Sequence, residues 1–302
     1  DREEENPERE GTVFVREADG SETEWPTLVR TRGNFRLQSR ICDVPPLRLN
    51  FPKSQVIGGV FEGQDKIKLV THCRDRYVEN ELREYLAYRI FNLITDEGVR
   101  VRLANVTYVD TSGRHEPLTR IAFFVEMEES LAARLRGDVI PDEDLTEGIH
   151  PARILAPNAA RVDLFAYMLG NTDYTMYFPS VNGWLHNIVP VELENGTVVA
   201  VPYDFDLSGL VDVAYAEPSE AVDIDRVTER IFRGLCRPGF DLGAAYAEFT
   251  AMKPAITSLV QSMDLLPEDE REDVLDYLDG FWNTIEDEGR ARQRIERACR
   301  PT

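Results

Sequence analysis

The stretch from Gly170 to Gly209 concentrates side chains that can hold a metal ion and accept a proton. Asp173 lies in a polar loop, and Asn187 opens a predicted strand. Asp204 and Asp206 follow the strand that returns. Carboxylate and carboxamide oxygens are ligands that Mg²⁺ takes alongside phosphate oxygens, and a separate aspartate can orient or deprotonate an attacking hydroxyl. The set predicts a metal–phosphate site, although for any single member a turn-stabilising role is the simpler interpretation.

A predicted β-hairpin brings these residues together. Its strands, Leu185–Glu192 and Thr197–Tyr203, flank an Asn-Gly turn at Asn195. Asn-Gly between two apolar strands is a strong hairpin signal, because both residues tolerate positive φ. A hairpin places its two open ends side by side, so Asn187 should lie close to Asp204.

The remainder of the chain divides into a strand-rich first part and a helix-rich second part. One helix, Asn80–Thr95, interrupts the strands, and Gly98 follows its end. We therefore predict an α+β fold with two lobes: a β-rich N-lobe over residues 1–125, with an acidic tail at 1–10, and a mainly helical C-lobe over 126–302 that carries the hairpin. Strands are expected at Thr12–Arg16, Asn34–Gln38, Leu47–Phe51, Lys66–Thr71, Val101–Val109 and Leu118–Val125, and further helices at Glu128–Leu135, Asn158–Leu169 and within Arg226–Arg300.

The 302-residue chain carries 34 Lys and Arg against 55 Asp and Glu, a formal net charge of −21. This acidity argues against a nucleic-acid binder, which needs a basic surface, and no apolar run approaches the roughly 18–20 residues that span a bilayer. The segment from Arg30 to Arg76 differs, because it holds ten basic and four acidic residues. It indicates a site for a compact polyanion such as a nucleotide phosphate chain. Strands whose outward faces carry arginine are the alternative interpretation.

The four cysteines fall as one early and one late pair, without a CxxC motif or a histidine at metal-ligand spacing. A structural zinc site is therefore not expected. Either all four are buried thiols, or two disulfides, Cys42–Cys73 and Cys236–Cys299, each close a loop within one half of the chain. The sequence starts at Asp1 without Met, as a mature exported or a trimmed chain does. Export to the cell envelope or beyond is favoured.

Several motifs share their order and spacing with a known family. The segments PPLRLNF, DKIKLVT, ELREYLAYRIFNLI and AFFVEMEESLA come first, and GNTDY, LHN and PYDFDLSG are the sharpest matches. Through them, from about Asn34 to Gly209, the chain resembles the spore coat protein H (CotH) family of atypical, secreted protein-kinase-like proteins. The resemblance implies a bilobal kinase-like fold that binds ATP and a divalent metal between its lobes.

The resemblance implies roles for residues in the sharpest motifs. Asp173 in GNTD resembles the catalytic-loop aspartate that accepts the proton of the substrate hydroxyl. Asn187 in LHN resembles the metal-binding asparagine. Asp204 or Asp206 in YDFD resembles the metal-binding aspartate after the hairpin, with Mg²⁺ or Mn²⁺ as the metal.

The resemblance also implies a nucleotide-binding set in the first lobe: a lysine for the phosphates, its glutamate partner on the helix, and a hinge for adenine. Lys68 matches the lysine, and Lys66 projects to the same face of the strand. The candidates are Lys68, Lys66 and Arg48 for the phosphates, Glu84 or Glu81 for the ion pair, and Glu126 with Met127 for the hinge.

Two features depart from typical kinases. Asp173 and Asn187 lie fourteen positions apart, which is wider than kinases use, and no GxGxxG loop is present. Arginine or lysine contacts would have to hold the phosphates instead. The leading hypothesis is an exported CotH-like kinase that transfers the ATP γ-phosphate to a protein hydroxyl. The alternatives are a kinase-fold module that binds nucleotide or a partner without transfer, and an acidic structural protein of an outer layer.

Overall fold

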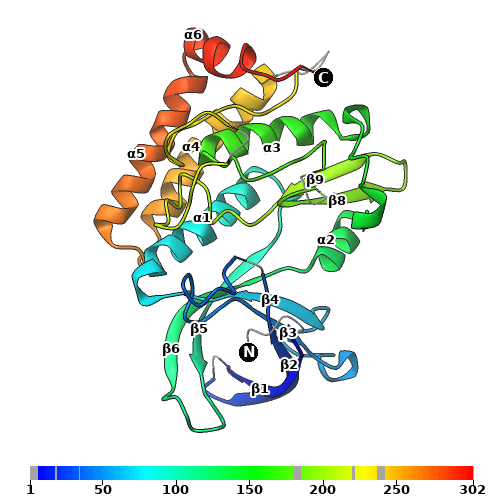
Figure 1. The fold of residues 1–302 in the computed structure, drawn as a ribbon, viewed down its shortest axis with the longest axis vertical. Helices are drawn as coiled ribbons and strands as arrows, with labels where there is room; N and C mark the ends of the chain where they lie inside the picture. The colour runs from blue at the N-terminus through cyan, green and yellow to red at the C-terminus, as the bar shows by residue number, and fades with distance from the viewer. Residues whose placement is uncertain are drawn as a thin grey trace. The chain divides into compact units, whose positions relative to one another are not determined.

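The computed structural model describes residues 6–17, 19–33, 35–179, 185–219, 222–236 and 242–301. It is an α+β structure, as the sequence predicts, with a curled sheet in one part and helices concentrated in the other (Figure 1). By their contacts, the residues form two compact units: 1–81 with 100–131, and 82–99 with 132–302. Residues 82–99 cluster with the helical unit, whereas the division predicted from the sequence falls after residue 125.

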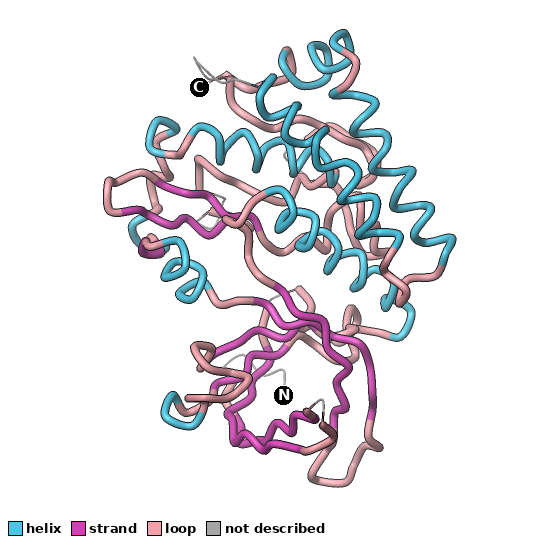
Figure 2. The backbone as a smooth tube through the Cα atoms, turned by 180° about the vertical axis from the view of Figure 1, so that it is seen from behind, coloured by secondary structure: helices cyan, strands magenta, loops and turns pink. Residues whose placement is uncertain are grey.

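The first unit is built on a six-stranded antiparallel sheet, which Figure 2 shows as a strongly curled set of strands. Consecutive strands are mostly neighbours in the sheet, and only the last two exchange places. The strand order is β1-β2-β3-β4-β6-β5. The strands are β1 (Arg9–Arg16), β2 (Glu22–Thr31), β3 (Leu47–Asn50), β4 (Lys66–Val70), β5 (Val101–Tyr108) and β6 (Leu118–Val125).

One face of this sheet is apolar because every second residue of its strands is hydrophobic. Leu49 pairs with Val29 on one side and with Ile67 on the other, so the three side chains form one row. The rings of Phe51 and Phe61 stack with centroids 4.4 Å apart and close this core. Burial of each such side chain stabilises the unit by about 1.5–3 kcal/mol.

The second unit combines helices with a small antiparallel sheet of order β7-β8-β9. Helices α1 and α2 begin within the first unit and end in the second. The strands are β7 (Gly137–Val139), β8 (Ile188–Leu193) and β9 (Val198–Pro202). The helices are α1 (Val78–Ile94), α2 (Glu128–Leu135), α3 (Ala156–Leu169), α4 (Leu242–Gln261), α5 (Glu268–Ile285) and α6 (Glu288–Ala291).

Aromatic side chains fill the interior of the second unit. Phe165 of α3 lies between Phe91 of α1 and Phe205, with ring centroids 4.7 Å and 5.5 Å away. Because Phe205 is the residue between Asp204 and Asp206, its burial fixes the turn that carries these two aspartates. The core therefore positions candidate site residues directly.

One predicted strand is wrong. Residues 35–41 form successive turns, in which Ile41 and Cys42 both donate their backbone N–H to the carbonyl of Gln38. Alternating side chains predicted a strand at Asn34–Gln38, but a strand also needs a neighbour to complete its hydrogen bonds, and this segment turns back on itself. Asn34 itself lies outside the described residues.

Both cysteine pairs are joined. Cys42 and Cys73, with Cα atoms 4.6 Å apart, form a disulfide in the first unit, and Cys236 and Cys299, 5.0 Å apart, form one in the second. Of the two interpretations, disulfides and not buried thiols are what the structure contains. Such bonds are compatible with an extracellular protein.

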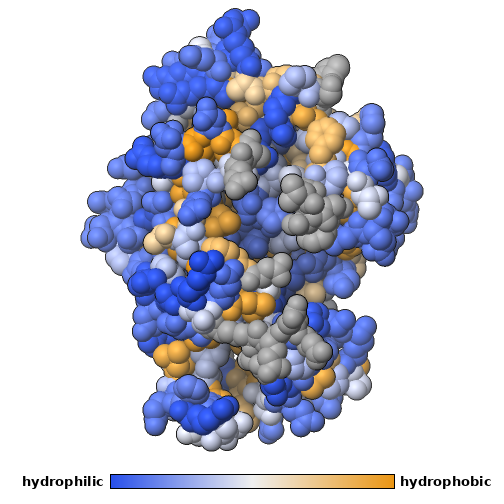
Figure 3. All heavy atoms as spheres, viewed as in Figure 1, coloured by the Kyte–Doolittle hydropathy of each residue, from blue (hydrophilic) through white to orange (hydrophobic). Residues whose placement is uncertain are grey.

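Hydrophilic residues predominate on the face drawn in Figure 3, as a chain of net charge −21 leads one to expect. Within the described residues, no helix combines the length and the apolar composition that crossing a membrane requires.

Candidate active site

The hairpin of β8 and β9 brings the predicted metal ligands together. Its open end is the pair Ile188 and Pro202, and Tyr203 then donates its backbone N–H to the carbonyl of Asn187 at 3.1 Å. Asn187 and Asp204 therefore lie next to each other at the open end of the hairpin, and both have a positive φ, 52° and 60° respectively. The juxtaposition that the hairpin predicted is confirmed.

Helix α3 fixes the hairpin through one buried side chain. Asn158 accepts a hydrogen bond from the backbone N–H of Ala200 at 2.8 Å and donates one to its carbonyl at 3.0 Å. A carboxamide that pairs with both backbone groups of a strand residue fixes the position of that strand along the helix axis. The register of β9 against α3 is thereby defined.

The end of α3 turns the chain into the loop of Asp173. Gly170 adopts the left-handed conformation that ends a helix, at φ 63°, and a Cβ there would lie 2.3 Å from the hydroxyl of Tyr277. Gly209 donates its backbone N–H to the Gly170 carbonyl at 3.3 Å. The segment after Asp206 thus returns to the end of α3, which places the loops of Asp173 and Asp206 side by side.

Asp173 is hydrogen-bonded to both residues that precede β8. The side-chain nitrogen of Asn187 donates to Oδ2 of Asp173 at 3.0 Å and to its carbonyl at 2.7 Å. Nε2 of His186 lies 3.1 Å from Oδ1 of Asp173. We call Asp173, Asn187, Asp204 and Asp206 the acidic cluster, with His186 as its imidazole neighbour.

All three aspartates of the cluster influence the pKa of His186. Its hydrogen bond to Asp173 raises the pKa of the imidazole above its usual value, against the opposing effect of burial. The charges of Asp204 and Asp206 raise this pKa further. The cluster therefore produces a negative field, which favours a bound cation.

The donor set fits a hard divalent cation. The Asn187 nitrogen faces Asp173, so its carboxamide oxygen points away from that carboxylate. Asp206 is buried, and the hydroxyl of Tyr215 donates to its Oδ2 at 3.2 Å. Asn187 and Asp206, with Asp204, would offer Mg²⁺ or Mn²⁺ oxygen ligands. In the part of the chain that the structure describes, no group of three or more His, Cys, Asp or Glu side chains is arranged to hold a metal, and this set instead combines two carboxylates with an asparagine.

A buried polar network anchors the Asp173 loop from beneath. Asp163 of α3, which is 1% exposed, accepts hydrogen bonds from the hydroxyls of Tyr174 at 3.0 Å and Tyr177 at 3.2 Å. Burial, together with the charge of Asp163, raises the pKa of Tyr174 well above its usual value, so it remains a donor. The residues that follow Asp173 are thus tied to the core.

Arg233 holds the same loop from another side. Its guanidinium donates to the carbonyl of Thr172, the residue before Asp173, and lies 5.5 Å from the ring centre of Tyr174. The carbonyl of Arg233 in turn accepts from the side chain of Arg300 at 2.8 Å. The disulfide Cys236–Cys299 fastens these two segments together.

In the first unit, three cations face one another across neighbouring strands. Arg30 of β2 pairs with Arg48 of β3, and Arg48 pairs with Lys68 of β4, so the three side chains share one face of the sheet. We call them the cation row. Lys68 is paired with Glu128 of α2, and Arg48 lies 2.9 Å from Glu8.

Lys68 lowers the pKa of its partner Glu128. Burial alone would raise the pKa of Glu128, but the attraction and hydrogen bond of Lys68 lower it below its usual value. Lys66 lies on the same face, opposite Asn50, and is half-buried. The structure therefore places the three phosphate-binding candidates, Lys68, Lys66 and Arg48, on one surface of the sheet.

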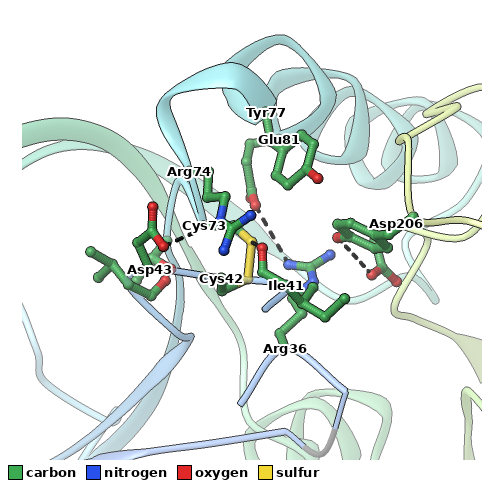
Figure 4. Close-up of a disulfide and its surroundings, with 12 residues drawn as sticks. Arg36, Ile41, Cys42, Asp43, Cys73, Arg74, Tyr77, Glu81 and Asp206 are labelled. Carbon is green, nitrogen blue, oxygen red and sulfur yellow. Dashed lines mark hydrogen bonds and ion pairs between the residues drawn. A yellow bond between two sulfur atoms is a disulfide. The ribbon is translucent and has the colours of Figure 1, made fainter. Parts of the chain in front are cut away.

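The two glutamate candidates on α1 fall in different units. Glu81, in the first unit, is buried, and its Oε1 lies 3.7 Å from Nη1 of the buried Arg36 (Figure 4). The disulfide Cys42–Cys73 lies beside this ion pair in Figure 4. Glu84, in the second unit, is 1% exposed.

The hinge candidates are engaged in backbone structure. Glu126 exchanges hydrogen bonds with Arg100: its N–H donates to the Arg100 carbonyl at 2.9 Å, and its carboxylate accepts from the Arg100 N–H at 3.0 Å. Met127 is buried, and its carbonyl accepts from Leu131 in the first turn of α2. Within the insertion between Asp173 and Asn187, residues 180–184, including Trp184, lie outside the described residues.

Three residues that contact the candidates or the Asp173 loop were given no role in the site from the sequence. His186 directly precedes Asn187, and this adjacency was a usable signal. Glu128 and Arg233 gave no such signal, because they are 60 and 61 positions from their partners Lys68 and Thr172.

No protein-family model matches this chain, and no curated protein matches it at a significant level.

Proposed function

We propose that this protein is an atypical, CotH-like kinase that transfers the γ-phosphate of ATP to a protein hydroxyl with Mg²⁺ or Mn²⁺. The observation that carries the proposal is the acidic cluster. Asp173 is joined to Asn187 by a 3.0 Å hydrogen bond. Asn187 lies at the open end of the hairpin, where the second strand leads to Asp204 and Asp206. Phosphoryl transfer needs such a division between an oxygen-rich metal site and a separate proton acceptor.

Asp173 is the residue that orients the acceptor hydroxyl and takes its proton. Its carboxylate is partly exposed, so a substrate can reach it, and Asn187 and His186 hold its two oxygens in place. Arg233 and the Asp163 network hold the backbone on either side of it. A fixed carboxylate avoids the entropic cost of orienting the base during the reaction.

Asn187 and Asp206, with Asp204, would hold the metal. When bound, a divalent cation neutralises the phosphate oxygens and stabilises the charge that develops during transfer. Tyr215 donates a hydrogen bond to Oδ2 of Asp206 and so helps to orient this carboxylate.

The cations of the first unit are suited to the phosphate chain. Lys68 is buried and forms an ion pair with Glu128. Arg48, beside it, carries the fork of donors that matches phosphate oxygens. In the absence of a GxGxxG loop, these side chains supply the contacts that backbone amides make in other kinases.

The decisive experiment measures nucleotide binding and phosphoryl transfer separately. Purified protein is titrated with ATP in the presence and absence of Mn²⁺, and then incubated with γ-labelled ATP and a protein acceptor. Asp206→Asn should abolish the metal-dependent part of ATP binding. Asp223→Asn, which replaces an exposed aspartate outside the cluster, is the matched control and should bind as wild type does.

Each outcome separates the proposal from its alternative. Metal-dependent binding with transfer supports the kinase. Binding without transfer in the wild type would replace it with a kinase-fold module that holds nucleotide or a partner. Absence of any metal-dependent binding would contradict both. We also propose that the protein acts outside the cytoplasm, because both disulfides need an oxidising compartment to persist.

A further inference from the structure

The cation row places three positive side chains directly opposite one another on neighbouring strands. Like charges directly opposite one another on neighbouring strands destabilise a sheet, so Arg30, Arg48 and Lys68 need anions. Glu128 pairs with Lys68. Glu8 pairs with Arg48 and is also attracted by Arg30. Glu8 therefore faces two cations of the row.

Two donors within the row are buried without an acceptor. The Nε atoms of Arg30 and Arg48 are shielded from solvent and have no hydrogen-bond partner among the described residues. Leaving a charged donor unsatisfied costs more than leaving a neutral one. A phosphate group, with several oxygens and up to two negative charges, can satisfy more of these donors than one carboxylate does.

Glu8 reaches the row from a short, anchored segment. The side chain of Asn6 is hydrogen-bonded to both the hydroxyl and the carbonyl of Thr31 at the end of β2. Glu8 then accepts from Arg48 at 2.9 Å and from Asn50 at 3.2 Å, and β1 begins at the next residue. The chain thus delivers a carboxylate to the place where an arginine fork would receive a phosphate.

We propose that Glu8 is a built-in competitor for the phosphate-binding side chains of the cation row, so that the N-terminal segment regulates access of a phosphate-chain ligand. The identity of that ligand as a nucleotide rests on the proposed function, whereas the competition concerns any compact polyphosphate. The apparent affinity of such a ligand is the intrinsic affinity multiplied by the fraction of molecules in which Glu8 has left Arg48.

The test compares Glu8→Gln with Glu10→Gln, a matched change two residues along the same segment at an exposed position. Inorganic tripolyphosphate without metal, and ATP with Mn²⁺, are titrated into each purified variant by calorimetry. Glu8→Gln removes the charge that competes for Arg48, so we expect it to bind tripolyphosphate about tenfold more tightly. Glu10→Gln should match the wild type.

A second pair of variants shows whether the gain comes from the row. In the Arg48→Gln background, Glu8→Gln should produce no gain, because the contested side chain is gone. A gain that survives there, or equal or weaker tripolyphosphate binding by Glu8→Gln, would overturn the competition. If Glu8→Gln gains tripolyphosphate affinity but no variant binds ATP with Mn²⁺, the competition stands and the kinase proposal fails. If ATP with Mn²⁺ binds to wild type, Glu8→Gln and Glu10→Gln with equal affinity, the nucleotide binding on which the proposed function depends is supported and the competition fails.

Discussion

The cation row and the acidic cluster each gather side chains of like charge, but they differ in how far the chain neutralises that charge. In the row, Glu8 and Glu128 lie against Arg48 and Lys68, so the chain supplies its own counter-charges. In the cluster, three aspartates gather around a single neighbouring imidazole, and the negative field is left in excess. A phosphate ligand of the row would therefore have to displace a carboxylate, whereas a cation bound to the cluster would supply a missing charge. Removing a carboxylate should strengthen ligand binding in the first and weaken it in the second.

The largest effect is expected for Asp173→Asn. This change keeps the size of the side chain but removes the proton acceptor, and general-base catalysis is worth roughly 10²–10⁴-fold in rate. The rate of phosphoryl transfer should fall by about this factor, while the Kd for ATP with Mn²⁺ stays within about threefold of wild type, because Asp173 is not a metal ligand in our assignment. An equal loss in Kd would move Asp173 into the metal site.

Next in size is the loss of the Cys236–Cys299 disulfide, which braces the cluster through Arg233. It closes a segment of 63 residues, so replacing both cysteines by serine should lower the free energy of unfolding by about 4 kcal/mol. Chemical denaturation measures this loss. The matched pair at Cys42 and Cys73 spans 31 residues and should cost nearly as much, because the entropy of loop closure grows slowly with length.

The two disulfide variants should differ at the cluster. Only the loss of Cys236–Cys299 frees the segment that holds Thr172 through Arg233. Under conditions where both variants remain folded, the NMR resonances of His186 should shift in this variant and not in the other. Equal shifts in both would show that the brace does not act on the Asp173 loop.

A smaller effect is expected for Tyr215→Phe, which removes the hydroxyl that donates to Asp206. Loss of such an outer hydrogen bond weakens metal affinity by about tenfold to a hundredfold, and the half-buried setting of Tyr215 favours the lower figure. Mn²⁺ titration measures it. Tyr203→Phe, a neighbouring change that leaves this hydroxyl in place, is the control.

The smallest effect concerns the pH dependence of stability in the cation row. Lys68 holds the pKa of Glu128 below its usual value near 4.5, so Glu128 contributes stability that is present above this pH and is lost as pH falls through its lowered pKa. In Glu128→Gln, the melting temperature should change less between pH 5 and about 3 than in wild type. Curves of equal slope would mean that the pair contributes nothing measurable.

The local parts of the site could be predicted from the sequence, and the long-range parts could not. The Asn-Gly turn fixes the hairpin from adjacent residues, so the approach of Asn187 to Asp204 followed from spacing alone. The pairing of Lys68 with Glu128 joins a strand to a helix that follows two further strands. No periodicity encodes such a contact, because it depends on how the sheet curls.

The fold shows the same limit. Amphipathic spacing located α1, α3 and the strand β6, because each pattern reports the face that is buried. The alternation at residues 34–38 gave the same signal without a partner strand, and the chain there forms turns. A side-chain pattern indicates which surface is buried, but it does not indicate whether the backbone has a neighbouring strand to hydrogen-bond with.

The positive φ angles of Asn187 and Asp204 restrict how these positions can vary among related sequences. Glycine, asparagine and aspartate enter the left-handed region at low cost, and other residues pay for it. An invariant Asn or Asp here would therefore arise from backbone geometry alone, even in a protein that binds no metal. Glycine at either position distinguishes the two causes: homologues that carry it have kept the turn and given up the ligand.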